Sequence, residues 1–337
     1  MLAAYIWHWW IGLVLLIAGI AGAVALIGGY LKQVSSQRYP GGKRTRARAL
    51  NQLDRLLPTA RSRHRRLVAC AFSGGPDSTA LVALARHAGL DVVAHHVDHG
   101  IRAESGREAE RAAAIADRLG ATFELHRAAV APGPNLEARA RAVRRSLIPA
   151  DAMTGHTLDD QAETVLIRLL RGSGTTGLAA IEPGERHPLL ALRRTDTEAV
   201  CAELGLEPVR DPSNDERSLW RSRIRHELLP LAADIAGRDV APIVARTADL
   251  LRDDDRVLAA LAAGLDPTDC RAIAGADPAI ARRALRDWLT EAGYPPDAAS
   301  IERVLDVAHG RAVACELPGG RRVERSGQAF RIVPPDG

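Results

Sequence analysis

A short loop between an apolar run and a helical pattern carries residue types that bind anions. The uncharged run at residues 67–72 predicts a buried strand, and residues 79–87 have apolar side chains at helical spacing. Between them lies SGGPDS, residues 73–78, where two glycines let backbone N–H groups approach a ligand closely. With the N-terminus of the helix behind it, this loop suits a phosphate. A tight turn with a capping serine explains the same residues, and the spacing and lysine of a Walker A loop are missing.

Histidines and carboxylates follow two later strand patterns. HHVDHGIRAES, residues 95–105, holds three histidines within five residues, and GHTLDDQAET, residues 155–164, opens a helix with acids. Asp160 and Glu163 are three residues apart and therefore share a face of that helix. Acids in a first turn also complement the helix dipole. For the histidines, we favour alternation between the two faces of a strand over a transition-metal site.

The order of the patterns predicts a parallel sheet. After the loop, strand and helix patterns alternate along the chain at 91–97, 104–119, 122–130, 135–147, 151–155 and 158–171. Such alternation is typical of an α/β domain with helices on both faces and with ligands at the carboxyl ends of the strands. The loop and both polar clusters fall at strand ends of this kind.

The last third of the chain predicts helices followed by a β-hairpin. Apolar residues recur at helical spacing in 240–263, 279–290 and 300–308. Two strand patterns, 313–317 and 321–333, flank a Pro-Gly-Gly turn. We expect four parts along the chain: an apolar anchor at 1–34, a basic linker at 35–64, an α/β domain at 65–210 and a mainly helical domain at 211–337.

The first residues predict one transmembrane helix. Residues 11–30 are twenty apolar or small side chains, the length that crosses a bilayer, and residues 3–31 are the expected membrane contact. Basic residues follow this run, so the positive-inside rule places the rest of the chain in the cytoplasm, tethered to the inner face of the plasma membrane. A cleaved signal peptide is disfavoured because the charges follow the run instead of preceding it. An upstream start codon, wrongly chosen, is the alternative explanation.

Composition limits the class of protein. The 337 residues have room for two folded domains, and 47% hydrophobic with 26% charged residues is typical of a globular chain. A net charge of +4 permits a nucleic-acid partner without requiring one. The four cysteines lie far apart and form no CxxC pair, which argues against a zinc or iron–sulfur site and for reduced cytosolic thiols.

Six blocks in order resemble the tRNA(Ile)-lysidine synthetase family, a branch of the PP-loop ATP pyrophosphatases. The resemblance covers about residues 65–232, is loose beyond 240, and rests on SGGPDS (73–78), HHVDHGIRAES (95–105), NLEARARAVRR (135–145), GHTLDDQAETVLIRLLRGSGTTGL (155–178), PLLALRR (188–194) and DPSNDERSLWRSRIRHELLP (211–230). It implies an adenine nucleotide α-hydrolase-like domain followed by a helical tRNA-binding extension.

The resemblance also implies an activity. Enzymes of this family use ATP and Mg²⁺ to join free L-lysine to the wobble cytidine of an isoleucine tRNA with a CAU anticodon, through an adenylated cytidine. By resemblance, ATP contacts are expected at Ser73, Gly74, Gly75, Pro76, Asp77 and Ser78; Mg²⁺ contacts at Asp77 and Asp160; catalytic roles at Asp77, Asp160, Glu163 and Arg141; and substrate contacts at His156, Arg194, Asp211 and Asn214.

Two differences from the family pattern and several alternative functions remain open. The family's RPLL reads HPLL here, with His187, and its RN pair reads Arg221-Ser222. A tRNA 2-thiolase is disfavoured by the missing CxxC, and an amidating synthetase of the GMP-synthetase kind by the GHTLDDQAET block. A membrane-tethered ATP-binding or RNA-binding module without catalysis is the rival from another class. The sequence leaves a homodimer open.

Overall fold

This computed structural model describes residues 66–98, 100, 105–128, 136–209, 220–291 and 296–333. The predicted anchor at 1–34 and linker at 35–64 lie outside these residues, so both stay predictions. Within the described part of the chain, no helix combines the length and the apolar character needed to cross a membrane.

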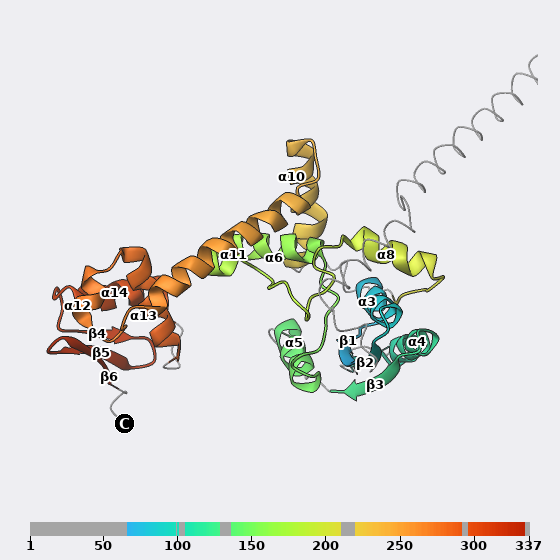
Figure 1. Cartoon of the computed structure of the whole chain (residues 1–337), viewed down its shortest axis with the longest axis horizontal. Helices are drawn as coiled ribbons and strands as arrows, with labels where there is room; N and C mark the ends of the chain where they lie inside the picture. Colours follow the sequence, from blue (N-terminus) through green and yellow to red (C-terminus); the bar gives the residue numbers. More distant parts are fainter. Residues whose placement is uncertain are drawn as a thin grey trace, which may run out of the picture. The chain divides into compact units, whose positions relative to one another are not determined.

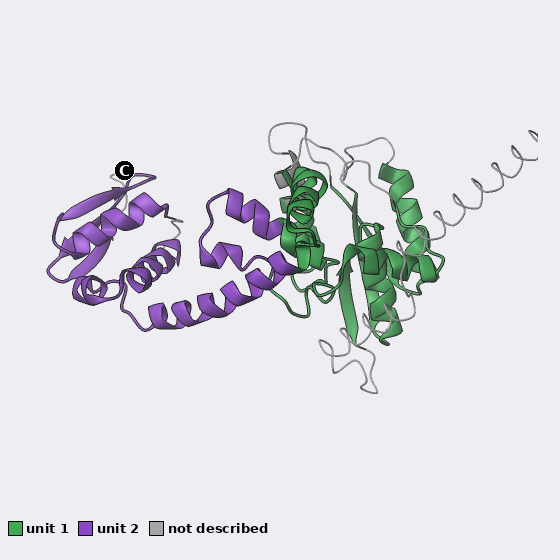
Figure 2. Ribbon diagram, turned by 90° about the horizontal axis from the view of Figure 1, so that it is seen from above, with its two compact units in different colours: residues 1–163, 182–242 green, residues 164–181, 243–337 purple. Residues whose placement is uncertain are grey.

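The chain divides into two compact units that interleave along the sequence (Figure 2). Unit 1 comprises Met1–Glu163 and Glu182–Pro242, and unit 2 comprises Thr164–Ile181 and Ile243–Gly337. The predicted domain boundary between residues 210 and 211 remains a prediction. The two units are defined by contacts in space, and each consists of segments that are separate along the chain.

Three parallel strands form the centre of unit 1 (Figure 1). They are β1 (Leu67–Ala71), β2 (Asp91–Asp98) and β3 (Thr122–Arg127), in the order β1-β2-β3. The strand predicted at 151–155 is reduced to a single parallel bridge between Cys70 and Met153 on the free edge of β1. The prediction of a parallel α/β sheet is therefore confirmed, with that strand shortened.

Helices follow the strands as the alternation predicts. In unit 1 they are α3 (Pro76–His87), α4 (Ser105–Arg118), α5 (Leu136–Leu147) and α8 (Arg194–Glu203), and α6 (Leu158–Leu170) begins there. The segment Ser78–Ala85 of α3 is buried throughout, because α3 packs on the sheet and against α8. Leu81, Leu84 and Leu189 are among the fully buried side chains of this core.

A continuous helical segment with a widened turn lies near the end of unit 1. It consists of α9 (Trp220–Arg223), the π-helical turn η3 (Ile224–Leu228) and α10 (Leu229–Ala236). Pro230, in the first turn of α10, has no amide hydrogen to continue an α-helical ladder. Single π turns inside helices are frequent at functional sites.

Unit 2 has helices beside an antiparallel sheet. Its elements are α7 (Thr175–Leu178), α11 (Ala241–Ala263), α12 (Cys270–Gly275), α13 (Pro278–Glu291), α14 (Ala298–Ala308), β4 (Ala314–Leu317), β5 (Arg321–Ser326) and β6 (Ala329–Val333). The predicted hairpin is present as β4 and β5, and the long second arm turns again at Gly327 to give a third strand. Leu285, Ile301 and Val323 meet in the core between helices and sheet.

Candidate functional site

The SGGPDS loop joins β1 to α3 and is held by its own serines. The Ser73 amide donates to Ser78 Oγ (3.2 Å), and the Gly75 amide donates to Ser73 Oγ (3.3 Å). Gly74 has φ +80°, a conformation that glycine adopts without strain. The N-cap of α3 is Gly75, which offers no side-chain acceptor to the first amides of the helix. A helix N-terminus left in this way is suited to receive an anion.

The segment that opens the GHTLDDQAET block lies directly against this loop. An ideal Cβ on Gly155 would lie 2.8 Å from both the carbonyl carbon and the oxygen of Asp77, and 3.0 Å from the Ser78 amide nitrogen. Real Cβ atoms essentially never come so close to backbone. Glycine at 155 is therefore what lets the two predicted motifs meet.

Three predicted carboxylates gather around one predicted arginine. Arg194 reaches Asp77 Oδ2 with Nε (3.5 Å), Asp160 Oδ1 with Nη2 (3.0 Å) and Glu163 Oε1 with Nη1 (3.3 Å). Asp77 comes from α3, the two other acids from the first turns of α6, and Arg194 from the start of α8. The structure thus brings together residues up to 117 positions apart, Asp77 and Arg194, in one site.

Glu163 is fully buried, and its carboxylate contacts two further arginines. Arg225 donates to both of its oxygens, at 2.7 Å and 3.0 Å, and Arg221 Nε lies 3.0 Å from Oε2. Both arginines belong to the helical segment around the π turn. A buried carboxylate costs several kcal/mol unless cations and hydrogen bonds compensate it. The three arginines provide this compensation and tie α8 and the π-turn segment to α6.

The neighbouring acids differ in how strongly they are compensated. Burial acts to raise the pKa of Asp160, but Arg194 and the Thr157 amide hold that pKa below its ordinary value. Burial raises the pKa of Asp77 to about 6, because Arg194 and the Thr197 hydroxyl only partly offset it. An added cation would therefore stabilise the charge of Asp77 more than that of Asp160.

His156, a predicted substrate contact, lies in a small polar cluster with His187. The Thr154 hydroxyl is 2.6 Å from His156 Nδ1 and 2.7 Å from His187 Nδ1. One hydroxyl has one hydrogen, so it donates to one ring and accepts from the other. Burial and Arg186 lower the pKa of His187. The histidine that replaces the family's arginine is thus mainly neutral and is paired through Thr154.

Three predicted site residues cannot be placed with the others. Arg141 belongs to α5, but its side chain lies outside what the structure describes, and Asp211 and Asn214 lie in the undescribed segment 210–219. Their roles stay predictions.

Several site residues were not predicted from the sequence. Arg221 and Arg225 are four residues apart in the RSLWRSRIRHELL stretch, and this spacing alone places them on one helical face. Arg193 pairs with Asp159 (2.7 Å) and, like its neighbour Arg194, ends the PLLALRR block. Thr197 and Gly155 have no comparable signal, because their importance comes from contacts with a loop distant in sequence.

Gly155→Ala is expected to displace the Asp77–Ser78 backbone and to lower the free energy of unfolding by about 1–3 kcal/mol. Backbone amide signals of Asp77 and Ser78 would shift in an NMR spectrum. Gly106→Ala in α4, where a Cβ meets nothing within 4 Å, is the matched control and should be neutral or slightly stabilising. Equal effects of the two changes on urea unfolding would contradict this packing.

Glu163→Gln removes the charge that three arginines share and is expected to cost about 3–5 kcal/mol of folding free energy. The control is Glu185→Gln, whose exposed ion pair with Arg66 (2.8 Å) is worth less than about 1 kcal/mol. Urea denaturation of both variants measures the difference. A Glu163→Gln midpoint equal to that of Glu185→Gln would show that the arginines do not depend on this carboxylate.

The raised pKa of Asp77 predicts a pH dependence of stability. Because the folded protein binds this proton near pH 6 and the unfolded chain near 3.8, the contribution of Asp77 to the free energy of unfolding, measured as the difference between the wild type and Asp77→Asn, should increase as pH falls from 7 towards 4. Asp77→Asn should remove this contribution and make the unliganded protein more stable at pH 7, by up to about 3 kcal/mol. Urea unfolding at pH 5 and pH 7 tests the sign, and a destabilised Asp77→Asn protein at pH 7 would refute it.

Comparison with known proteins identifies the family of the chain. A family model described as "PP-loop domain" matches residues 45–232, and one described as "TilS substrate binding domain" matches residues 269–329. The tRNA(Ile)-lysidine synthase of Nocardia farcinica is 42% identical over 282 residues, covering 79% of this chain and 88% of that protein. The synthase of the same name from Thermobifida fusca is 39% identical, with 77% and 89% covered.

Among solved structures, the U34-tRNA thiolase NcsA from Methanococcus maripaludis superposes with a TM-score of 0.50 at 16% identity, covering 61% of this chain and 78% of that one. This likeness concerns the fold alone. The Nocardia and Thermobifida relatives and the PP-loop match, which spans more than half of the sequence, decide the family. The chain belongs to the tRNA(Ile)-lysidine synthase family of PP-loop proteins.

Proposed function

We propose that this chain is a tRNA(Ile)-lysidine synthetase, which uses ATP to ligate L-lysine to the wobble cytidine of isoleucine tRNA with a CAU anticodon. The products are lysidine, AMP and pyrophosphate. The observation that carries the proposal is the meeting of Asp77, Asp160, Glu163 and Arg194 at the SGGPDS loop. The family to which the chain belongs supports the choice of substrates.

The SGGPDS loop and Arg194 are suited to the first step, the adenylation of cytidine. The cytidine O2 attacks the α-phosphate of ATP, a P–O bond forms, and pyrophosphate leaves. Negative charge builds on the phosphate oxygens, where the first amides of α3 and a fixed guanidinium stabilise it. The Arg194 guanidinium contacts three carboxylates and therefore has a defined position before the substrate binds.

The second step needs an unprotonated amine. The ε-amine of lysine, with an ordinary pKa near 10.4, gives up a proton, attacks C2 of the activated cytidine, and displaces AMP as the C2–O2 bond breaks. A carboxylate near the amine can accept that proton or orient the group that does. Asp160 stays ionised and hydrogen-bonded at neutral pH because Arg194 and Thr157 lower its pKa, so it suits orientation.

The acids of the site fit a magnesium ion. Mg²⁺ binds oxygen ligands, commonly one or two carboxylates together with phosphates of the substrate. Asp77 and Asp160 both contact Arg194, and burial raises the pKa of Asp77, which indicates a carboxylate that further positive charge would stabilise. We propose that these two side chains would hold the ion, which when bound supplies charge neutralisation at the phosphates.

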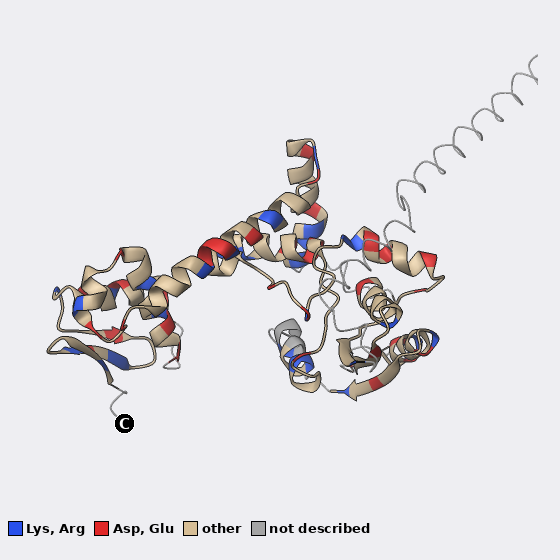
Figure 3. Cartoon of the chain, viewed as in Figure 1, with Lys and Arg blue, Asp and Glu red and all other residues tan. Residues whose placement is uncertain are grey.

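Unit 2 is the proposed tRNA-binding part. The family match at 269–329 covers α12 through β5, where the helices pack beside the small sheet. Acidic and basic side chains are mixed on α11, which carries Asp253 and Arg256 as an ion pair (Figure 3). β5 carries Arg321, Arg322 and Arg325, and β6 carries Arg331, so contacts with the RNA backbone are proposed there instead of along α11.

The second substrate, the compartment and the oligomeric state are also proposals. Free L-lysine as the second substrate, the cytoplasm as the compartment, membrane attachment through residues 3–31 and a homodimer are all expectations from the sequence. Their support is the composition, the apolar first segment and the family, and each needs its own experiment.

The activity is tested by transfer of labelled L-lysine to an unmodified isoleucine tRNA transcript with a CAU anticodon, using the full-length chain, ATP and Mg²⁺. Label on the tRNA, with one AMP released for each lysine, is the expected result. Asp77→Ala should reduce the rate at least about a hundredfold, because it removes a carboxylate at the reacting phosphates.

Glu110→Gln, an exposed change on α4, is the control for Asp77→Ala and should retain the wild-type rate. ATP cleavage by the wild-type chain without label on the tRNA would sink the lysidine assignment and favour another PP-loop substrate. A transcript with a GAU anticodon should accept no lysine.

A further inference from the structure

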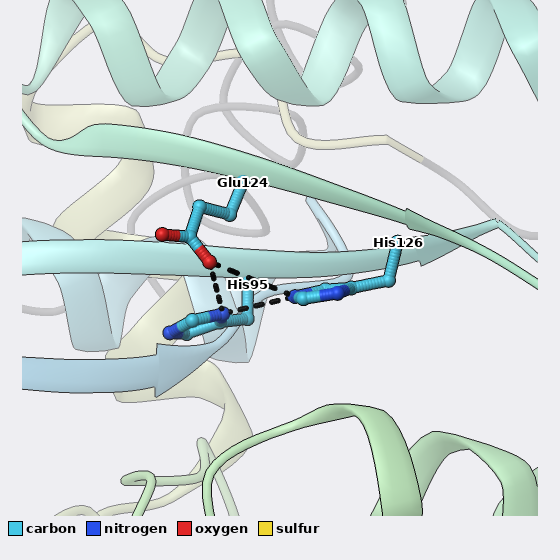
Figure 4. Close-up of side chains that lie close together, drawn as sticks. All are labelled: His95, Glu124 and His126. Atoms are coloured by element: carbon cyan, nitrogen blue, oxygen red, sulfur yellow. Dashed lines mark hydrogen bonds and ion pairs between the residues drawn. The ribbon is translucent and has the colours of Figure 1, made fainter.

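Two neighbouring strands place two imidazoles and a carboxylate side by side. In the parallel register His95 on β2 pairs with Glu124 on β3, and His126 lies two residues further along β3. Residues two apart share a face of a strand, so all three side chains project from the same face of the sheet. Figure 4 shows them converging, with one ring nitrogen of each histidine facing the other and the Glu124 carboxylate above.

The two adjacent histidines of β2 do not both belong to this cluster. His96 lies on the opposite face of β2, where its Nδ1 is 2.9 Å from the Phe72 carbonyl oxygen and its ring packs against Phe123. The expected alternation of His95 and His96 between two faces is therefore present. The partners of His95 come from β3 instead, from a separate part of the sequence.

The three ligand atoms are spaced as a metal ion requires. His95 Nδ1 lies 3.0 Å from His126 Nε2 and 3.1 Å from Glu124 Oε2, and the last two atoms are 3.9 Å apart. The circle through three atoms at these separations has a radius of about 2 Å, which is the length of Zn–N and Zn–O bonds in proteins. One ion can therefore lie within bonding distance of all three, and side-chain rotation that closes the 3.9 Å pair would bring them towards the tetrahedral arrangement that zinc prefers.

A cation would also resolve the proton problem in this cluster. Without one, either neutral tautomer leaves a conflict. A hydrogen on His95 Nδ1 has to serve both His126 Nε2 and a Glu124 oxygen, whereas a hydrogen on His126 Nε2 leaves the His95 Nδ1 lone pair facing that oxygen. The His95 side chain is 8% exposed, whereas that of Glu124 is 51% exposed, so the cluster is closed to solvent at His95 and open to solvent at Glu124.

We propose that His95, Glu124 and His126 bind a divalent zinc-class ion, with water in the remaining position. Two imidazoles and a carboxylate are a donor set that zinc commonly accepts. The ion would join the edge strand β3 to β2. His95 also accepts a backbone hydrogen bond from Phe72 (2.8 Å), the residue before the SGGPDS loop, so the ion braces the strand that supports the loop. This inference is independent of the proposed function.

The test measures Zn²⁺ binding to the full-length chain, purified without a histidine tag, by competition with a chromogenic chelator. One ion per chain is expected, and added Zn²⁺ should raise Tm because it binds the folded form. Co²⁺ in its place should give the visible absorption bands of a bound ion. His126→Gln and Glu124→Gln should each weaken binding about tenfold or more.

Both substituted side chains are partly exposed, so these variants are expected to fold, and their Tm without ion checks this. His309→Gln and Glu110→Gln change an exposed histidine and an exposed glutamate elsewhere and should bind like the wild type. Binding that is absent in the wild type, or equal in the wild type and both cluster variants, would overturn the proposal and leave a hydrogen-bonded histidine pair with an acidic neighbour.

Discussion

The buried charge of Glu163 is the constraint around which unit 1 is arranged. A carboxylate with no exposed surface has to be matched by cations at close range, and here the cations come from two elements that are distant in sequence, α8 and the segment around the π turn. Their helices can therefore pack only where Arg194, Arg221 and Arg225 converge. The same convergence fixes Arg194 beside Asp77 and Asp160, so the compensation of one buried acid also shapes the site.

The SGGPDS loop depends on packing from behind as well as on its own hydrogen bonds. Gly155 allows the backbone of the next motif to touch Asp77, and the Val209 amide donates to the Gly74 carbonyl oxygen (2.8 Å). A loop held on both sides keeps its amide groups oriented before a ligand binds, which is the general requirement for electrostatic stabilisation of a transition state. In the loop held in this way, the buried charge of the Asp77 carboxylate is only partly compensated by Arg194 and Thr197.

Local patterns predicted the elements well, and contacts between distant segments were harder to predict. The alternating patterns located β1 to β3 and their helices because apolar periodicity directly reflects burial. The strand expected at 151–155 became a bridge at Met153, since pairing length depends on the neighbouring strand and not on propensity. Asp77, Asp160, Glu163 and Arg194 were predicted by resemblance, whereas the pairing of His95 with Glu124 depends on a register that no local pattern encodes.

The interleaving of the two units sets the order in which the chain can mature during synthesis. Residues of unit 2 leave the ribosome after Glu163, before Glu182–Pro242 has completed unit 1. The core that supports the SGGPDS loop includes Leu206 and Val209, so the loop is made early and supported late. During that interval Leu206 and Val209 cannot yet cover the apolar flanks of the loop, and transiently exposed apolar surface of this kind favours aggregation.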